Sequence, residues 1–272
     1  MKWYIFGQLF LLKINGNVFV MFGFWEDLFM SRNSDIIRDS RGFLAIKRVL
    51  LVALIAVVGD LFFTLVGDVI DDKIGEFYGG SLILALVATI FGAVMLGTLY
   101  QLITFNRSER GVFDYFKNGR LLWVLIKISV LQAIFTMLWS ILLLIPGIVK
   151  AYAYTQAIPK AVDDFEKGRP LQGALAYIGW SDDQMKGYKG QLFMLTLTWY
   201  VIMFALIILI YLGYVVLTHQ SVGIYFTDNT FISAYGSTLI TIIPSLIAIP
   251  TIIVRQTVFS RDFIREQDAP VK

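Results

Sequence analysis

The sequence predicts an all-α, polytopic membrane protein with six transmembrane helices and both termini in the cytoplasm. The composition, the lengths of the apolar stretches and the distribution of basic residues carry this prediction. Of the 272 residues, 57% are apolar and 16% are charged, against about 25% charged in an average soluble domain. The mean hydropathy is +0.71. A soluble chain of this size could not hide that much apolar surface from water, which excludes a soluble enzyme, a nucleic-acid-binding protein and a disordered chain.

Six apolar stretches are the predicted membrane spans. A spanning helix needs about 20 mostly apolar residues, and five of the stretches meet that length. The remaining stretch, over residues 147–162, is shorter and contains Lys150, Pro159 and Lys160. In chain order, the predicted spans cover residues 49–70, 81–105, 121–145, 147–162, 191–218 and 234–254.

The basic residues decide whether the short stretch crosses the membrane, because cytoplasmic loops are enriched in Lys and Arg. If residues 147–162 cross, four basic regions all lie in the cytoplasm, and the two loops poor in basic residues, 71–80 and 219–233, lie outside. We therefore predict that they cross, with a tight outer turn at Pro146-Gly147, since proline can end one helix and open the next. The basic regions contain Arg32, Arg38, Arg41, Lys47 and Arg48; Arg107, Arg110, Lys117 and Arg120; Lys160, Lys167, Arg169, Lys186 and Lys189; and Arg255, Arg261, Arg265 and Lys272.

The sequence contains no motif for catalysis, for a cofactor or for a metal ion. It has no P-loop, no dinucleotide-binding glycine motif and no zinc-protease motif. There are no cysteines, and the single histidine, His219, has no strong metal ligand near it in sequence. We therefore expect no catalytic residue, no cofactor and no metal site.

Polar residues inside the spans are the better candidates for function, because each is costly in lipid and usually faces a partner or water. Asp60 lies near the middle of the first span, and Lys127 and Gln132 lie in the third. One interpretation is a buried Asp60–Lys127 ion pair that fixes helix register. Alternatively, Asp60 is a protonatable or cation-binding site, binds a partner protein, or is simply tolerated.

Other polar residues are expected at the surface. We expect the carboxylate pairs 163–164 and 182–183 to be solvated in a cytoplasmic loop, and Lys150 to contact lipid headgroups. Residues 181–190 are typical of a short interfacial helix with Met185, Tyr188 and Leu192 facing lipid.

Small residues recur at three- and four-residue spacing in the second span, which lets helix backbones approach closely in lipid. This face packs inside the bundle or against a second copy of the chain. Its residues are Ala85, Ala88, Gly92, Ala93 and Gly97.

Two short motifs resemble an uncharacterised integral membrane family of Gram-positive bacteria, catalogued as domain of unknown function 975. The first motif includes Ile145, Pro146, Gly147 and Lys150, and the second includes Met185, Lys186 and Gly187. The resemblance covers roughly residues 34–265. It implies a multi-pass protein of a bacterial plasma membrane and supplies no activity.

Residues 1–29 are predicted to lie upstream of the natural protein, with translation starting at Met30. The apolar runs in this segment are too short to span a membrane, and no signal-peptide cleavage site follows them. The resemblance begins only after the segment. Trp25-Glu26-Asp27 can also be encoded with GGAGG, a bacterial ribosome-binding sequence. The alternative is an amphipathic hairpin that lies on the membrane. We expect residues 30–272 to form a single domain.

The function most consistent with the sequence is that of a non-enzymatic accessory or scaffold protein that binds membrane proteins or lipids. Short loops and few buried polar residues favour it. The alternative is a transporter or exporter of a small or amphiphilic solute. That alternative needs a polar path through the bundle, for which the sequence offers Asp60, Lys127, Gln132 and the proline-broken helices.

Overall fold

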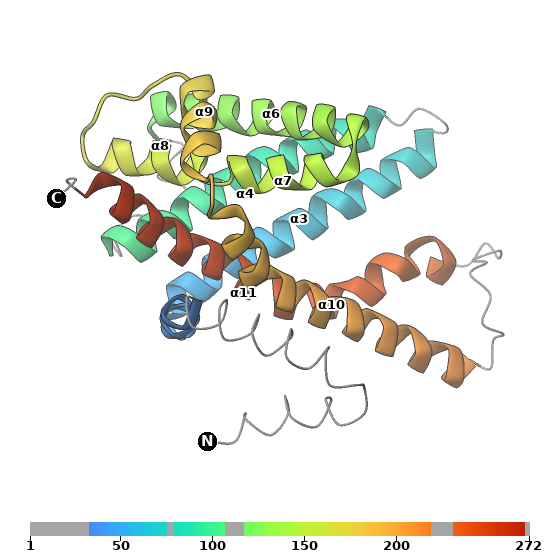
Figure 1. The fold of residues 1–272 in the computed structure, drawn as a ribbon. Coiled ribbons are helices and arrows are strands. Elements are labelled where there is room, and N and C mark those ends of the chain that lie inside the picture. Colours follow the sequence, from blue (N-terminus) through green and yellow to red (C-terminus); the bar gives the residue numbers. More distant parts are fainter. Residues whose placement is uncertain (1–32, 75–78, 107–116, 219–230, 270–272) are drawn as a thin grey trace.

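A computed structural model describes residues 33–74, 79–106, 117–218 and 231–269 (Figure 1). The predictions about residues 1–29, Met30 and His219 fall outside these ranges. Within them the chain is helical and contains no strand, which confirms the predicted all-α class. Residues 33–44 are helical, and the labelled helices are α3 (Lys47–Ile74), α4 (Gly79–Phe105), α6 (Gly119–Leu142), α7 (Leu144–Tyr154), α8 (Ala157–Glu166), α9 (Ala174–Gln184), α10 (Lys189–Thr218) and α11 (Phe231–Asp268).

Four of these helices are long and apolar enough to cross a membrane. Their apolar segments are Lys47–Gly67, Ile83–Phe105, Gly119–Leu142 and Lys189–Gly213, with mean hydropathy between 2.1 and 2.7. Each segment has between 21 and 25 residues, and about 20 residues suffice to span a bilayer. These segments coincide with the first, second, third and fifth predicted spans.

The helices are arranged as three antiparallel hairpins (Figure 1). In the first hairpin α3 packs against α4, and in the third α10 packs against α11. In the second, α7 and then α8 run back along α6. The C-terminal part of α11 joins the hairpins, since α11 also packs against α3, α4 and α8.

The connection between α6 and α7 differs from the predicted turn at Pro146-Gly147. The chain turns at Leu143, a single extended residue with φ −158° and ψ 132°. Pro146 and Gly147 lie in the first turn of α7. Proline is tolerated there because the first N–H groups of a helix have no partner within the helix.

The segment expected to form one helix over residues 147–162 forms two, which are separated at Thr155 and Gln156. The physical reason is Pro159. A proline has no N–H to donate to the carbonyl of residue i−4, here Thr155, and its ring collides with that carbonyl. The break places Pro159 in the first turn of α8, where it is tolerated.

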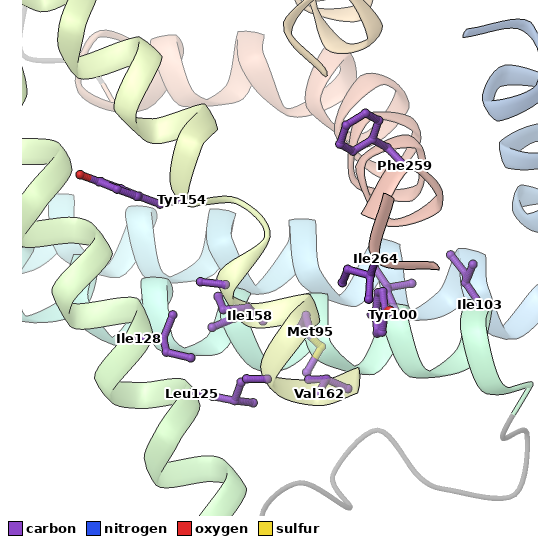
Figure 2. Close-up of a cluster of buried hydrophobic side chains, with 14 of the residues drawn as sticks. Met95, Tyr100, Ile103, Leu125, Ile128, Tyr154, Ile158, Val162, Phe259 and Ile264 are labelled. Carbon is purple, nitrogen blue, oxygen red and sulfur yellow. The ribbon is translucent and has the colours of Figure 1, made fainter. Parts of the chain in front are cut away.

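The buried core lies toward one end of the bundle. In Figure 2, Leu125 and Ile128 of α6 lie close to Met95 of α4 and to Ile158 and Val162 of α8. The α6–α7 turn, by contrast, is covered with exposed apolar side chains, such as Ile141 and Ile145 at 69% and 74% exposure. A surface of this kind is stable when it is covered by lipid rather than by water.

Gly147 allows α7 to approach α6 closely, which gives a first prediction. A Cβ atom on Gly147 would lie 2.3 Å from Ser140 Oγ and 2.8 Å from Ser140 Cα. The backbone of α6 cannot yield as a flexible side chain could, so Gly147→Ala should destabilise the purified protein by about 1–3 kcal/mol. Thermal unfolding in detergent measures this effect.

The matched control is Gly179→Ala, within α9, where a Cβ atom would have no neighbour within 4 Å. We expect this variant to be neutral or slightly stabilised, because alanine is the better helix former. Equal unfolding temperatures for the two variants would contradict a tight α6–α7 contact at Gly147.

Candidate functional site

Asp60 lies on α3 and lines two adjoining cavities, of about 260 Å³ and 520 Å³. We call them the Asp60 cavities. Its carboxylate makes no hydrogen bond or ion pair with any side chain that the structure describes. Ala88 and Gly92 of α4 line both cavities, and their small size leaves open space beside the carboxylate.

The ion pair expected between Asp60 and Lys127 is not formed among the described side chains. The ammonium group of Lys127 instead lies 5.1 Å from the centre of the Trp123 ring, one helical turn earlier on α6. Residues four apart in a helix lie on the same face, so the two side chains meet there. A cation over an indole ring is favourable and requires no buried anion. Both residues are exposed, as is Asp60, and Lys127 lines neither the Asp60 cavities nor the cavity beside Gln132.

Gln132 lies at a third cavity, of about 390 Å³, between α4, α6, α8, α11 and the break that follows α7. We call it the polar cavity. The side-chain amide of Gln132 donates a hydrogen bond to the backbone carbonyl of Tyr154, the last residue of α7. That carbonyl has no partner within the helix, because the helix ends there. Gln132 therefore stabilises the broken end of α7.

Amides and hydroxyls line the polar cavity together with the apolar side chains of Leu96, Ala133, Ala151 and Ile158, and no Asp, Glu, Lys or Arg side chain lines it. A cavity of this size falls in the range of about 300–1,000 Å³ that is typical of small-molecule sites. The polar residues that line it are Thr89, Ser129, Gln132, Thr136, Tyr154, Thr155, Gln156, Gln256 and Ser260.

The three cavities adjoin one another. Leu96 and Gln256 line both the polar cavity and the smaller Asp60 cavity. Thr89 lines both the polar cavity and the larger Asp60 cavity. The cavities therefore form one series from Asp60 on α3 to the break between α7 and α8.

The five small residues on the predicted packing face of α4 have two different surroundings: some line a cavity, and the others are buried in the bundle. Ala85, Ala88 and Gly92 line the larger Asp60 cavity, whereas Ala93 and Gly97 are buried. The three outer positions thus face the space beside Asp60. A small side chain at these positions keeps that space open.

A cluster of charged side chains lies at the core end of the bundle, where α8 meets the end of α11. We call it the charged cluster, and its members are Lys160, Asp163, Asp164, Lys167, Arg169 and Asp268. The expectation that Asp163 and Asp164 are solvated is wrong, since their side chains are only 1% and 5% exposed. Burial of the two carboxylates is offset by surrounding cations and by tyrosine hydroxyl donors.

The tyrosines come from two other helices. Tyr100 of α4 donates to Asp163 Oδ1 at 3.2 Å, and Tyr177 of α9 donates to Asp164 Oδ2 at 3.1 Å. Burial and the nearby Asp164 carboxylate raise the pKa of Tyr177 to about 12. At neutral pH the hydroxyl is therefore protonated and can donate this hydrogen bond.

Lys150 was expected at the lipid headgroups and Asp182 in solvent, but the two side chains form an ion pair with each other. Lys150 Nζ is 2.6 Å from Asp182 Oδ2, and Lys189 Nζ is 3.1 Å from Asp182 Oδ1. Burial alone would raise the pKa of Asp182, but the hydrogen bonds from the two lysines outweigh burial and hold this pKa below its ordinary value. Asp183 does lie at the surface, where it pairs with Lys186.

The second motif follows directly after α9. Met185 and Leu192 were expected to face lipid, yet both side chains are 0% exposed. The backbone of Gly187 has φ +88°, a conformation that glycine adopts without strain, in the short connection between α9 and α10. At this connection Met185 is buried in the core and Lys186 is exposed. The two motifs lie near each other, because Lys150 of the first motif forms an ion pair with Asp182, three residues before the second motif begins.

Sequence reasoning identified Asp60 and Gln132 and missed Gln156, Gln256 and Ser260. Gln256 and Ser260 are four residues apart in α11, and such a polar pair on one helix face was an available signal. Gln156 stands three residues before Pro159, at the position where the proline interrupts the helix.

Comparison with known proteins gives no match: no family model matches the chain, and neither does a curated protein or a solved structure. Over the residues that the structure describes, the fold defines the class, a helical protein with four helices that are long and apolar enough to cross a membrane.

Asp268 gives a prediction about pH. Burial raises its pKa, but hydrogen bonds from Lys167, Lys160 and Arg169 outweigh burial and hold this pKa well below its ordinary value. The stabilisation is therefore complete above the unfolded pKa, about 3.9, and is lost as the pH falls toward the folded pKa. Asp268→Asn should lower the free energy of unfolding by about 1–3 kcal/mol at pH 7.

The difference in unfolding temperature between Asp268→Asn and the unchanged protein should be constant from about pH 8 to pH 5 and shrink below that. The control is Asp183→Asn, because the Asp183 side chain is 68% exposed and its pair with Lys186 contributes little. Equal effects of the two substitutions would show that the charged cluster does not stabilise the fold.

Proposed function

We propose that the chain spans a bacterial plasma membrane six times, with both termini in the cytoplasm. Two more passes, by α7 with α8 and by α11, would join the four long apolar helices. Hydrogen bonds that link the predicted cytoplasmic regions support this arrangement. Arg261 binds Asp39 at 2.9 Å, and Lys160 binds Asp268 at 3.0 Å. Such contacts require the N-terminal helix, α8 and the end of α11 to meet on one side.

Within that membrane domain, we propose that the protein transports a small solute. The single observation that carries this proposal is the series of cavities from Asp60 to the broken helix α7–α8. Membrane transporters commonly bind substrates and ions where a helix is interrupted, because free backbone groups and polar side chains face a cavity there. An unpaired carboxylate such as Asp60 could take up a proton or a cation as the solute moves.

The sequence alone favoured a scaffold, because it contains few polar residues within the spans. In three dimensions Asp60 and Gln132, together with Gln156 at the interrupted segment, line adjoining cavities. A scaffold has no need of such a path, and each buried polar group in lipid has a cost. The geometry therefore favours transport over the scaffold role.

A non-enzymatic accessory or scaffold role remains the second candidate, because much of the surface of α10 is left uncovered by its contacts with α11 and α7. Only 11% of its most apolar stretch is buried, and Val201, Phe204 and Leu209 are 58%, 64% and 66% exposed. The bilayer can cover this surface, as can another membrane protein or a second copy of the chain. Both candidate functions are non-enzymatic.

The six-pass arrangement predicts which positions are accessible from outside the cell. Single cysteines can be introduced cleanly because the chain contains none. Ser221→Cys and Ser233→Cys should react with an impermeant maleimide in intact cells, and Gly168→Cys should react only after the cells are opened. Labelling of Gly168→Cys in intact cells would contradict the proposal that α7 and α8 together cross the membrane.

The transport proposal predicts that water enters the polar cavity. Thr136→Cys, which faces this cavity, should react with a hydrophilic methanethiosulfonate reagent in proteoliposomes, because a thiol reacts as the thiolate and needs water to ionise. Its neighbour Met137 is 63% exposed on the outer face of α6 and lies at nearly the same depth. Met137→Cys should react at least tenfold more slowly. Similar slow rates for both would favour the scaffold role.

A further inference from the structure

Gln156 is completely buried at the break between α7 and α8, and one atom of its side chain has no partner. Its backbone N–H donates to Ser181 Oγ at 3.1 Å, and Ser181 Oγ donates to the carbonyl of Ala153 at 2.6 Å. These two bonds fix the backbone on both sides of the break. The side-chain oxygen Oε1, by contrast, has no hydrogen-bond partner, although Gln156 lines the polar cavity.

The hydrogen bonds around Thr155 show which end of the Gln156 amide is unpaired. The Thr155 hydroxyl donates its only hydrogen to the carbonyl of Tyr152 at 2.9 Å. Thr155 Oγ1 can therefore only accept from Gln156, at 3.1 Å. The atom that donates must be the amide nitrogen Nε2. The unpaired atom is consequently the oxygen, an acceptor.

A buried acceptor without a partner is unfavourable, because it has lost its hydrogen bonds with water and gained none in the protein. Native structures retain few such groups, and each calls for an explanation. A molecule in the polar cavity that donates a hydrogen bond to Gln156 Oε1 would remove this cost. Among the residues that the structure describes, no donor reaches Gln156 Oε1.

The remaining lining of the polar cavity selects against charge. Gln132, Gln256, Thr136 and Ser260 offer amides and hydroxyls, and no ionised side chain lines the cavity. An ion that entered would lose its hydration without gaining an opposite charge, which is strongly unfavourable in an apolar surrounding. A neutral molecule with several hydroxyl or amide groups would exchange its hydrogen bonds with water for bonds to these side chains.

We propose that the polar cavity is a binding site for a small, uncharged solute that carries hydroxyl or amide N–H donors, with Gln156 Oε1 as a principal acceptor. This assignment rests on the proposed transport function and specifies its substrate class. Asp60, in the adjoining cavities, is separate from this site and takes no part in recognising the neutral solute.

The test is protection of Thr136→Cys from a hydrophilic methanethiosulfonate reagent in proteoliposomes. The neutral probes are glycerol, erythritol, sorbitol and myo-inositol, and the charged counterparts are gluconate and glucosamine. At 10 mM, at least one neutral probe should slow the reaction threefold or more, and the charged probes should leave its rate unchanged. Gly168→Cys, in the loop before α9, controls for viscosity and for direct effects on the reagent.

Gln156→Leu in the Thr136→Cys background should abolish the protection by the neutral probe. Its matched control is Gln191→Leu. Gln191 lies at the start of α10, donates a hydrogen bond to Asn33 and does not line the cavity. Should Gln156→Leu fail to fold, Ser260→Ala, at the part of the cavity lining that α11 supplies, should weaken the protection at least twofold. Protection that survives both substitutions would overturn the assignment.

The outcomes separate this inference from the function on which it rests. If Thr136→Cys reacts readily and no neutral probe slows it, the cavity holds only water and the inference is overturned, while water entry still supports transport. Equal protection by charged and neutral probes would also overturn it. If Thr136→Cys does not react at all, the transport proposal itself fails.

Discussion

The missing N–H of Pro159 is the constraint on which much of this structure depends. One helix over residues 147–162 would expose the carbonyl of Thr155 to the ring of Pro159, so the chain breaks there and begins again as α8. The break has consequences on both of its sides. Gln132 hydrogen bonds to the free end of α7, and Gln156 is buried with an unpaired oxygen beside an uncharged cavity.

The other side of the break is dominated by charge. Helix α8 carries Lys160, Asp163 and Asp164 into the core, where ionised groups are tolerated only with partners. Those partners come from the loop after α8, from the tyrosines of α4 and α9, and from Asp268 at the end of α11. The demand for partners therefore joins helices that lie far apart in the sequence. The polar cavity lies at the break itself, and the charged cluster begins one turn later, on α8.

The candidate site could be predicted only in part. Asp60 and Gln132 were identified because a polar residue within an apolar stretch is conspicuous, and both do line cavities. The ion pair with Lys127, one of the interpretations open for Asp60, is not formed among the described side chains, because sequence position gives the depth of Lys127 in the bundle but not the direction in which its helix face points. Gln156 was missed for a related reason, since its burial depends on where the helix breaks and on what packs around the break.

The sequence by itself determined the helical class, the four long apolar helices and the residues that are costly in lipid, because composition and helix length act locally along the chain. It also located Pro159, the origin of the break. Only the tertiary structure decided which polar groups meet. Asp163, Asp164 and Met185 resemble surface residues in sequence, yet they are buried because α8, α9 and α11 converge on them. Burial depends on the relative rotation and packing of several helices, and no local pattern encodes that rotation.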